Sequence, residues 1–129
     1  MLTAYSTTSV WVSSMDLKQL LGESVTVIVD RPLGTTHPNH NDIIYPVNYG
    51  YIENIFACDG EEQDAYILGV EEKLNIFKGT VIAIIHRNDD VEDKLVVAPN
   101  NMKFTSKEIM EKVNFQEQYF NTEIIMYNI

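Results

Sequence analysis

The most informative part of the sequence is YPVNYGYIENIFACDGEEQD, residues 45–64. Its first half, with three tyrosines around a Pro-x-Asn core, predicts an aromatic strand. Its second half places four acids within six positions. In an extended chain, residues two apart face the same side, so Asp59 and Glu61 point together, and a bend at Gly60 brings Asp64 toward them. Carboxylates this close repel one another, and their pKa values rise unless a cation lies between them.

A bound divalent cation removes this conflict, because Mg²⁺ takes oxygen ligands and retains several waters. The simpler interpretation is a solvated acidic turn. A second acidic window, residues 89–93, follows a predicted strand and runs directly into Lys94. Carboxylates beside a lysine suit a site that metal ions and phosphate oxygens share. The two windows together therefore favour a metal-dependent phosphate site.

The overall composition limits the partners. The net charge of −10 argues against nucleic acid and anionic membranes, since both require a basic footprint. No apolar run approaches the roughly 20 residues that span a bilayer, and the N-terminus lacks the basic and apolar regions of a signal peptide. The single cysteine, Cys58, fits a reducing compartment and is interpreted as a small buried hydrophobe. We therefore expect a cytoplasmic protein.

The length of 129 residues predicts one domain. We place it at residues 15–129, with residues 1–14 as a disordered or loosely attached extension. Runs rich in β-branched residues, separated by turn residues, predict strands near residues 25–29, 49–56, 65–70, 80–86 and 94–98.

Two helices are expected. A short one over residues 15–21 would begin after Ser14 and stop at Gly22. A longer one over residues 105–120 opens with the capping box Thr105-x-x-Glu108. The expected fold is mainly β with α (α+β): a small closed OB-like β-barrel with the C-terminal helix packed on it.

The motifs resemble the soluble family I inorganic pyrophosphatases, of which this chain would be a short, divergent member. YPVNYGYI followed by DGEEQDAYIL is similar to that family's Tyr-Pro-x-Asn-Tyr-Gly-Tyr-Ile strand and its Asp-Gly-Asp-Pro-x-Asp loop. DDVEDKLVVAP resembles the second acidic loop, and FQEQYF resembles the aromatic helix with its Tyr-Lys pair. The resemblance implies hydrolysis of inorganic pyrophosphate to two phosphates by a metal-activated water, with two or more Mg²⁺ ions.

The resemblance also assigns roles to particular residues. The implied metal ligands are Asp59, Glu61, Asp64, Asp89 and Glu92, with Asp90 and Asp93 competing for the last two places. The implied substrate-binding residues are Lys94, Arg31, Tyr45 and Tyr119. The implied catalytic residues are Glu61, as the base for the attacking water, and Tyr49, near the phosphate.

The sequence departs from the family pattern in ways that bear on activity. Glu61 replaces an aspartate, so its carboxylate reaches one methylene further. Phe120 stands where a phosphate-binding lysine is expected, and the family's early Glu and Lys ligands find no clear match. His37 and His40 lie outside the pattern and either replace lost cationic groups or are surface polar residues. Reduced activity is therefore expected.

Two alternatives from other classes remain open. One is a non-catalytic or weakly active barrel that binds a nucleotide or polyphosphate. The other is a structural divalent-metal site in a protein-binding domain. Homo-oligomerisation is implied by the resemblance alone, because bacterial members of the family are often hexamers.

Overall fold

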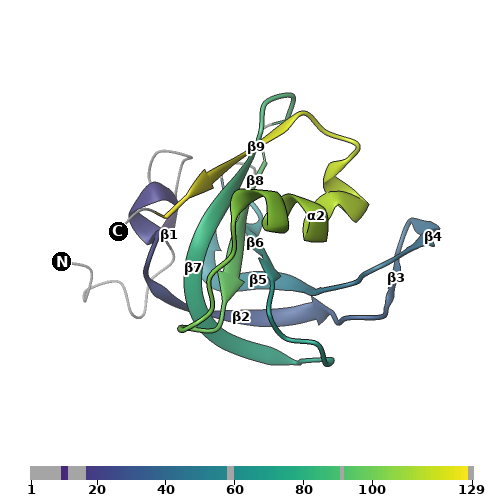
Figure 1. The fold of residues 1–129 in the computed structure, drawn as a ribbon, viewed down its shortest axis with the longest axis horizontal. Coiled ribbons are helices and arrows are strands. Elements are labelled where there is room, and N and C mark those ends of the chain that lie inside the picture. The colour runs from purple at the N-terminus through teal and green to yellow at the C-terminus, as the bar shows by residue number, and fades with distance from the viewer. Residues whose placement is uncertain (1–9, 12–16, 58–59, 91, 128–129) are drawn as a thin grey trace.

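The computed structural model describes residues 10–11, 17–57, 60–90 and 92–127 and shows a closed β-barrel (Figure 1). The barrel strands are β2 (Ser24–Arg31), β5 (Asn48–Phe56), β6 (Glu62–Ile67), β7 (Ile76–Arg87) and β8 (Asp93–Ala98). Their order is β5-β2-β7-β8-β6, and β6 closes the barrel by pairing with β5. β6 and β8 run parallel, while the other barrel pairs are antiparallel. This mixed barrel confirms the predicted fold class.

Several elements lie outside the barrel. β3 (Thr36–His37) and β4 (His40–Ile44) form a hairpin that projects from one end of the molecule (Figure 1). β9 (Thr122–Met126) pairs with β7, and β1 (Val10–Trp11) pairs with β5 within the segment predicted to be loosely attached. These short strands were not predicted. Of the first predicted helix, the structure describes Leu17, which is α-helical, and the 3₁₀ turn η2 (Lys18–Leu20) that follows it; the predicted N-cap Ser14 and the first two predicted helix residues lie outside the described residues.

Side chains alternate along each barrel strand, so each strand contributes side chains to both faces of the wall. Both faces are covered by apolar packing. One face forms the barrel interior, which consists mainly of valine, isoleucine and leucine, among them Val27, Ile67, Ile84 and Leu95. The other face forms a second core outside the wall, where Tyr45, Tyr49, Tyr66, Ile85 and Val96 pack with helix residues. β8 is therefore buried along its whole length.

The helix α2 (Ser106–Glu117) covers this second core (Figure 1). The predicted capping box is present, with Thr105 Oγ1 accepting from the backbone N–H of Glu108 and the Glu108 carboxylate accepting from that of Thr105. Ile109 and Val113 are buried and face the barrel. The helix ends at Glu117, so Phe120 lies beyond it, although the helix was predicted to reach residue 120.

Asn48 explains the Pro-x-Asn core of the signature strand. Its side-chain oxygen accepts from the backbone N–H groups of Leu33 and Leu74, and its amide donates to the carbonyl of Glu72. The fully buried side chain thus ties two loops to the end of β5. Within the part of the chain that is described, no helix is long and apolar enough to cross a membrane.

Candidate functional site

The site lies on the outer face of the barrel wall, where rows of side chains emerge from beneath α2. Residues two apart on a strand share a face. On β6, Asp64 therefore lies on the same face as the buried Tyr66, and on β8 Lys94 lies on the same face as the buried Val96. Arg87 ends the corresponding row of β7. Each row is apolar under the helix and ends in a charged group.

Lys94 joins the two acidic windows. Its Nζ donates to Asp64 Oδ2 at 2.7 Å and to Glu92 Oε1 at 2.6 Å. Lys94 is only 4% exposed, whereas both carboxylates reach the surface. The buried ammonium is therefore the counter-charge that makes two neighbouring acids tolerable in this structure.

Two tyrosines of the signature strand orient the charged groups. The Tyr49 hydroxyl donates to Asp64 Oδ2 at 2.8 Å. Burial, assisted by the charge of Asp64, raises the pKa of Tyr49 well above its usual value, so the hydroxyl remains a donor at neutral pH. Tyr45 is completely buried, accepts from Arg31 Nη1 at 2.8 Å and donates to Gln116 at 3.2 Å. Arg31 is thereby held against the aromatic rings.

Arg87 is fixed by the end of α2. Its Nε and Nη2 donate to the two carboxylate oxygens of Glu117 at 3.0 and 2.7 Å. Its guanidinium carbon lies 3.7 Å from the centroid of the Phe120 ring. Burial opposes the charge of Arg87, but hydrogen bonds and attraction to Glu117 outweigh it and raise the pKa of the guanidinium. A permanent cation therefore stands beside Phe120, the position where the resemblance predicts a lysine.

One cavity, which we call the acidic cavity, has a volume of about 370 Å³. It is lined by Asp30, Tyr51, Ala57, Glu61, Glu62, Gln63, Asp64, Glu92, Asp93 and Lys94. Acids from both sequence windows therefore meet in one place. Burial raises the pKa of Asp30, partly offset by the neighbouring Arg31.

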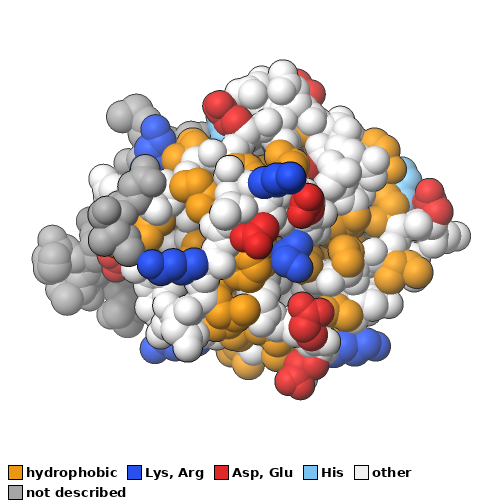
Figure 2. Space-filling model, in the orientation of Figure 1, with side chains coloured by type: hydrophobic (Ala, Val, Ile, Leu, Met, Phe, Trp, Pro, Cys, Tyr) orange, Lys and Arg blue, Asp and Glu red, His pale blue; other side chains and the backbone are white. Residues whose placement is uncertain are grey.

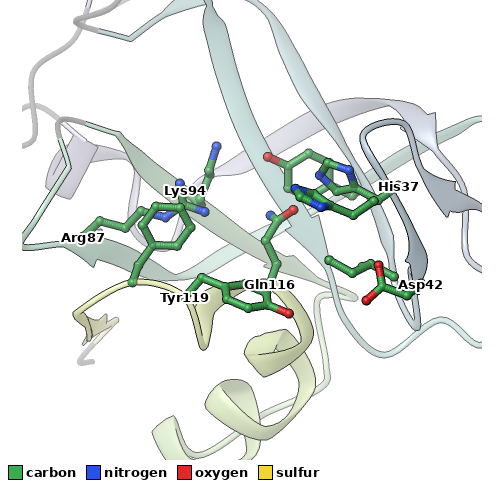
Figure 3. A pocket seen from close by; sticks show the side chains of 10 residues that line it. His37, Asp42, Arg87, Lys94, Gln116 and Tyr119 are labelled. Carbon is green, nitrogen blue, oxygen red and sulfur yellow. The ribbon is translucent and has the colours of Figure 1, made fainter.

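The second cavity, which we call the aromatic cavity, has a volume of about 380 Å³. It is lined by His37, His40, Asp42, Ile43, Tyr49, Arg87, Lys94, Gln116, Tyr119 and Phe120. Figure 3 shows Lys94 and Arg87 on one side, and His37 and Asp42 of the hairpin on the other, with Gln116 and Tyr119 at the end of the helix between them. Lys94 lines both cavities and forms their common wall.

The donor chemistry of the acidic cavity fits a hard divalent cation, since its polar lining is dominated by carboxylates. Two further oxygens at its wall, Asp93 Oδ2 and Gln63 Oε1, are buried and have no hydrogen-bond partner among the described residues. Within those same residues, no three His, Cys, Asp or Glu side chains are grouped closely enough to hold a metal ion. The predicted ligand Asp59 and the neighbouring Cys58 lie outside the described residues.

The predicted site residues divide into two groups. The structure brings together Glu61, Asp64, Glu92 and Lys94 around the acidic cavity. It places Tyr49, and Tyr119, which is 64% exposed, at the aromatic cavity. Asp89, Tyr45 and Arg31 are not among the described residues that line either cavity. The Asp89 carboxylate instead accepts the backbone N–H of Asn121 at 3.1 Å.

Sequence reasoning missed Arg87, Gln116, Asp42 and Ile43 as cavity residues. Arg87 gives no local signal, because its partner Glu117 is thirty residues away. The THPNH stretch was a weak signal, since its two histidines were noted as outside the family pattern. Both line the aromatic cavity.

The comparisons with known proteins agree with the architecture. The structure is similar to an inorganic pyrophosphatase from Ehrlichia chaffeensis, with a TM-score of 0.64, 14% identity, and coverage of 83% of this chain and 88% of that one. The pyrophosphatase from Neisseria gonorrhoeae gives a TM-score of 0.56, 21% identity and 81% coverage of both chains. The pyrophosphatase from Thermus thermophilus gives a TM-score of 0.56, 14% identity, and coverage of 81% of this chain and 83% of that one.

At the level of sequence, no protein-family model and no curated protein matches the chain. At these identities the structural similarity establishes the fold alone. The chain thus has the barrel fold seen in inorganic pyrophosphatases.

Proposed function

We propose that the protein hydrolyses inorganic pyrophosphate to two phosphates in a reaction that depends on divalent cations, Mg²⁺ in the first place. The observation that carries the proposal is the position of Lys94, which separates a cavity rich in carboxylates from one that contains cationic groups. A diphosphate beside this ammonium would face metal ligands on one side and cationic donors on the other. The similarity to pyrophosphatase folds supports the same assignment.

The residues that would hold the cations are Asp59, Glu61, Asp64 and Glu92. When bound, the metal lowers the pKa of a coordinated water and neutralises phosphate oxygens. Glu61 lines the acidic cavity, and its carboxylate would accept a proton from the attacking water. The Tyr49 hydroxyl donates a hydrogen bond to Asp64 Oδ2 and so holds the Asp64 carboxylate in a fixed orientation.

The cationic side would position the phosphates. Lys94 and Arg87 both line the aromatic cavity and are both buried, so their charges act with little solvent screening. Asp90 Oδ2 lies 3.6 Å from Arg87 Nη1 and is a second carboxylate neighbour of the guanidinium. The pairing with Glu117 leaves the guanidinium little freedom of movement. Groups fixed in this way stabilise charge on the leaving phosphate without reorganisation.

A second candidate is binding of a diphosphate without turnover. It is favoured by one specific observation: the carboxylates of Asp64 and Glu92 are already hydrogen-bonded to the ammonium of Lys94. A divalent cation would have to compete with that ammonium for both carboxylates. Weak metal binding would leave the water unactivated.

The test is release of phosphate from pyrophosphate by the purified full chain, with Mg²⁺ and with a chelator. The matched control is the double variant Glu61→Gln/Asp64→Asn, prepared identically. We expect Mg²⁺-dependent release that falls by at least about 100-fold in the double variant. Equal release by the wild type and the double variant would show that the activity comes from a contaminant. Binding of the non-hydrolysable methylenediphosphonate with no release from pyrophosphate would establish the second candidate.

Two further expectations stay predictions: location in the cytoplasm, which rests on the composition and the single cysteine, and self-association into a homo-oligomer, which rests on the resemblance alone. Light scattering coupled to size-exclusion chromatography measures the second directly. A mass of about 14.8 kDa, that of one chain, would contradict it.

A further inference from the structure

The aromatic cavity contains groups for which a bare phosphate has no use. Ile43, Tyr119 and Phe120 line it beside the cationic Lys94 and Arg87. Figure 2 shows hydrophobic side chains at the end of the molecule where the β3–β4 hairpin lies. The cavity volume of about 380 Å³ falls within the range of about 300–1,000 Å³ that is typical of sites for organic ligands. The charged oxygens of pyrophosphate would gain nothing from apolar walls.

The hairpin side carries a negative charge. Asp42 lines the cavity on the side opposite Lys94 and Arg87 (Figure 3). A carboxylate in this place repels a second phosphate, but it accepts hydrogen bonds from neutral hydroxyl or amino groups. The barrel wall therefore presents Lys94 and Arg87, each already paired with carboxylates, and the hairpin adds the further carboxylate of Asp42.

His37 provides a neutral ring on the same side. Its Nδ1 accepts the backbone N–H of Asn39 at 3.0 Å, so in the neutral ring the proton lies on Nε2. Burial, together with the charges of Arg31 and His40, lowers the pKa of His37, which favours the neutral form. The ring lies nearly parallel to that of Tyr45, at an angle of 11° and a centroid distance of 6.0 Å. It therefore continues the aromatic layer into the cavity wall.

We infer that the aromatic cavity binds the organic group of a phosphate ester, and that a nucleoside diphosphate occupies the site better than inorganic pyrophosphate does. The diphosphate lies at Lys94 and Arg87, the base lies against Tyr119 and the hairpin, and the ribose hydroxyls donate to Asp42. This inference adds an organic ligand class to the site of the proposed function and rests on that function for the position of the diphosphate. Stacking of a base on an aromatic side chain strengthens binding by about tenfold or more.

The experiment compares two non-hydrolysable ligands that differ only in the nucleoside: α,β-methylene ADP and methylenediphosphonate. Their affinities for the full chain are measured by calorimetry in the presence of Mg²⁺. We expect the nucleotide analogue to bind at least about tenfold more tightly. Tyr119→Ala and Asp42→Ala should each bring the ratio of the two affinities closer to one. Tyr127→Ala, at an exposed tyrosine outside the cavity, is the matched control and should leave the ratio unchanged.

Equal affinity for the two analogues, or an unchanged ratio in both cavity variants, would overturn the inference. Neither result depends on turnover. A chain that releases phosphate from pyrophosphate but shows equal affinities retains the proposed function and loses the inference. A chain that prefers the nucleotide analogue but releases no phosphate from pyrophosphate retains the inference and loses the proposed hydrolysis.

Discussion

The acidic cavity and the aromatic cavity share Lys94 but are assembled in different ways. The acidic cavity takes most of its charged residues from two short windows of sequence, residues 61–64 and 92–94. The aromatic cavity combines a hairpin, residues of the three barrel strands β5, β7 and β8, and the residues at and just beyond the end of α2. A cluster of like charges is visible in a sequence, whereas a cavity whose walls come from distant elements is not. The comparison also predicts a division of work, with metal on one side and the organic phosphate on the other.

The largest expected effect tests the acidic side. Glu61→Gln keeps the size of the side chain and removes its basicity, so turnover should fall by about 10²–10⁴-fold. Asp64→Asn should instead weaken Mg²⁺ binding, and excess Mg²⁺ should restore part of its activity. Turnover titrated against Mg²⁺ measures both. Equal rescue of the two variants would make Glu61 only another ligand.

The next prediction tests how the aromatic side is held together. Glu117→Gln leaves the buried Arg87 without its full counter-charge, so the free energy of unfolding should fall by about 3–5 kcal/mol. Glu111→Gln, at an exposed position of the same helix, is the control and should change it by less than about 0.5 kcal/mol. Urea denaturation measures both. A loss no greater than that of the control would mean that Glu117 does not fix Arg87.

The third prediction separates the two cavities at their common wall. Lys94→Met removes the cation that we propose binds phosphate, and it frees Asp64 and Glu92 from their contacts with the ammonium. We expect affinity for methylenediphosphonate to fall by about tenfold, and affinity for Ca²⁺ without that ligand to rise by about as much, since one charge near a surface is worth about 1–4 kcal/mol. Calorimetry measures both. Affinities that fall together would show that Lys94 supports the fold instead of separating the two sites.

The smallest effect concerns pH. Burial raises the pKa of Tyr49 and Tyr66 well above the usual value. Because the unfolded chain loses these protons near pH 10, the stability that they contribute is complete below pH 10 and is lost as the pH rises toward the folded values. Above pH 10, each tyrosine should lower the free energy of unfolding by up to about 1.4 kcal/mol per pH unit, which urea denaturation at a series of pH values measures. Tyr66→Phe should reduce the slope and the exposed Tyr127→Phe should not; equal slopes would contradict the burial argument.

Much of the fold could be predicted because its signals are local. Dense β-branched runs marked the barrel strands, and the capping box at Thr105 marked the start of α2. The predicted strand at residues 65–70 begins earlier, at Glu62, because pairing with β5 extends β6 into the acidic window. β1 and β9 depend on the distant strands β5 and β7, and β3 and β4 pair only with each other in a short hairpin, so these strands of two to five residues carry no comparable signal.

The site was predictable only in part for the same reason. Lys94 follows the second acidic window directly in the sequence, and the structure places it between Glu92 of that window and Asp64 of the first. Asp89 belongs to the same window, yet it accepts a backbone hydrogen bond beyond α2. Spacing alone does not distinguish these outcomes, because one residue of shift along a strand or loop turns a side chain to the opposite face.

The most direct test of the account is the coupling between the two cavities. Calorimetry of methylenediphosphonate binding to the full chain, with and without Mg²⁺, measures it for the wild type and for Asp64→Asn. Because cation and diphosphate would meet at Lys94, we predict that Mg²⁺ raises the affinity by at least about tenfold in the wild type, and by much less in the variant. Equal affinity with and without Mg²⁺ in the wild type would contradict the claim that the acidic and aromatic cavities form one site.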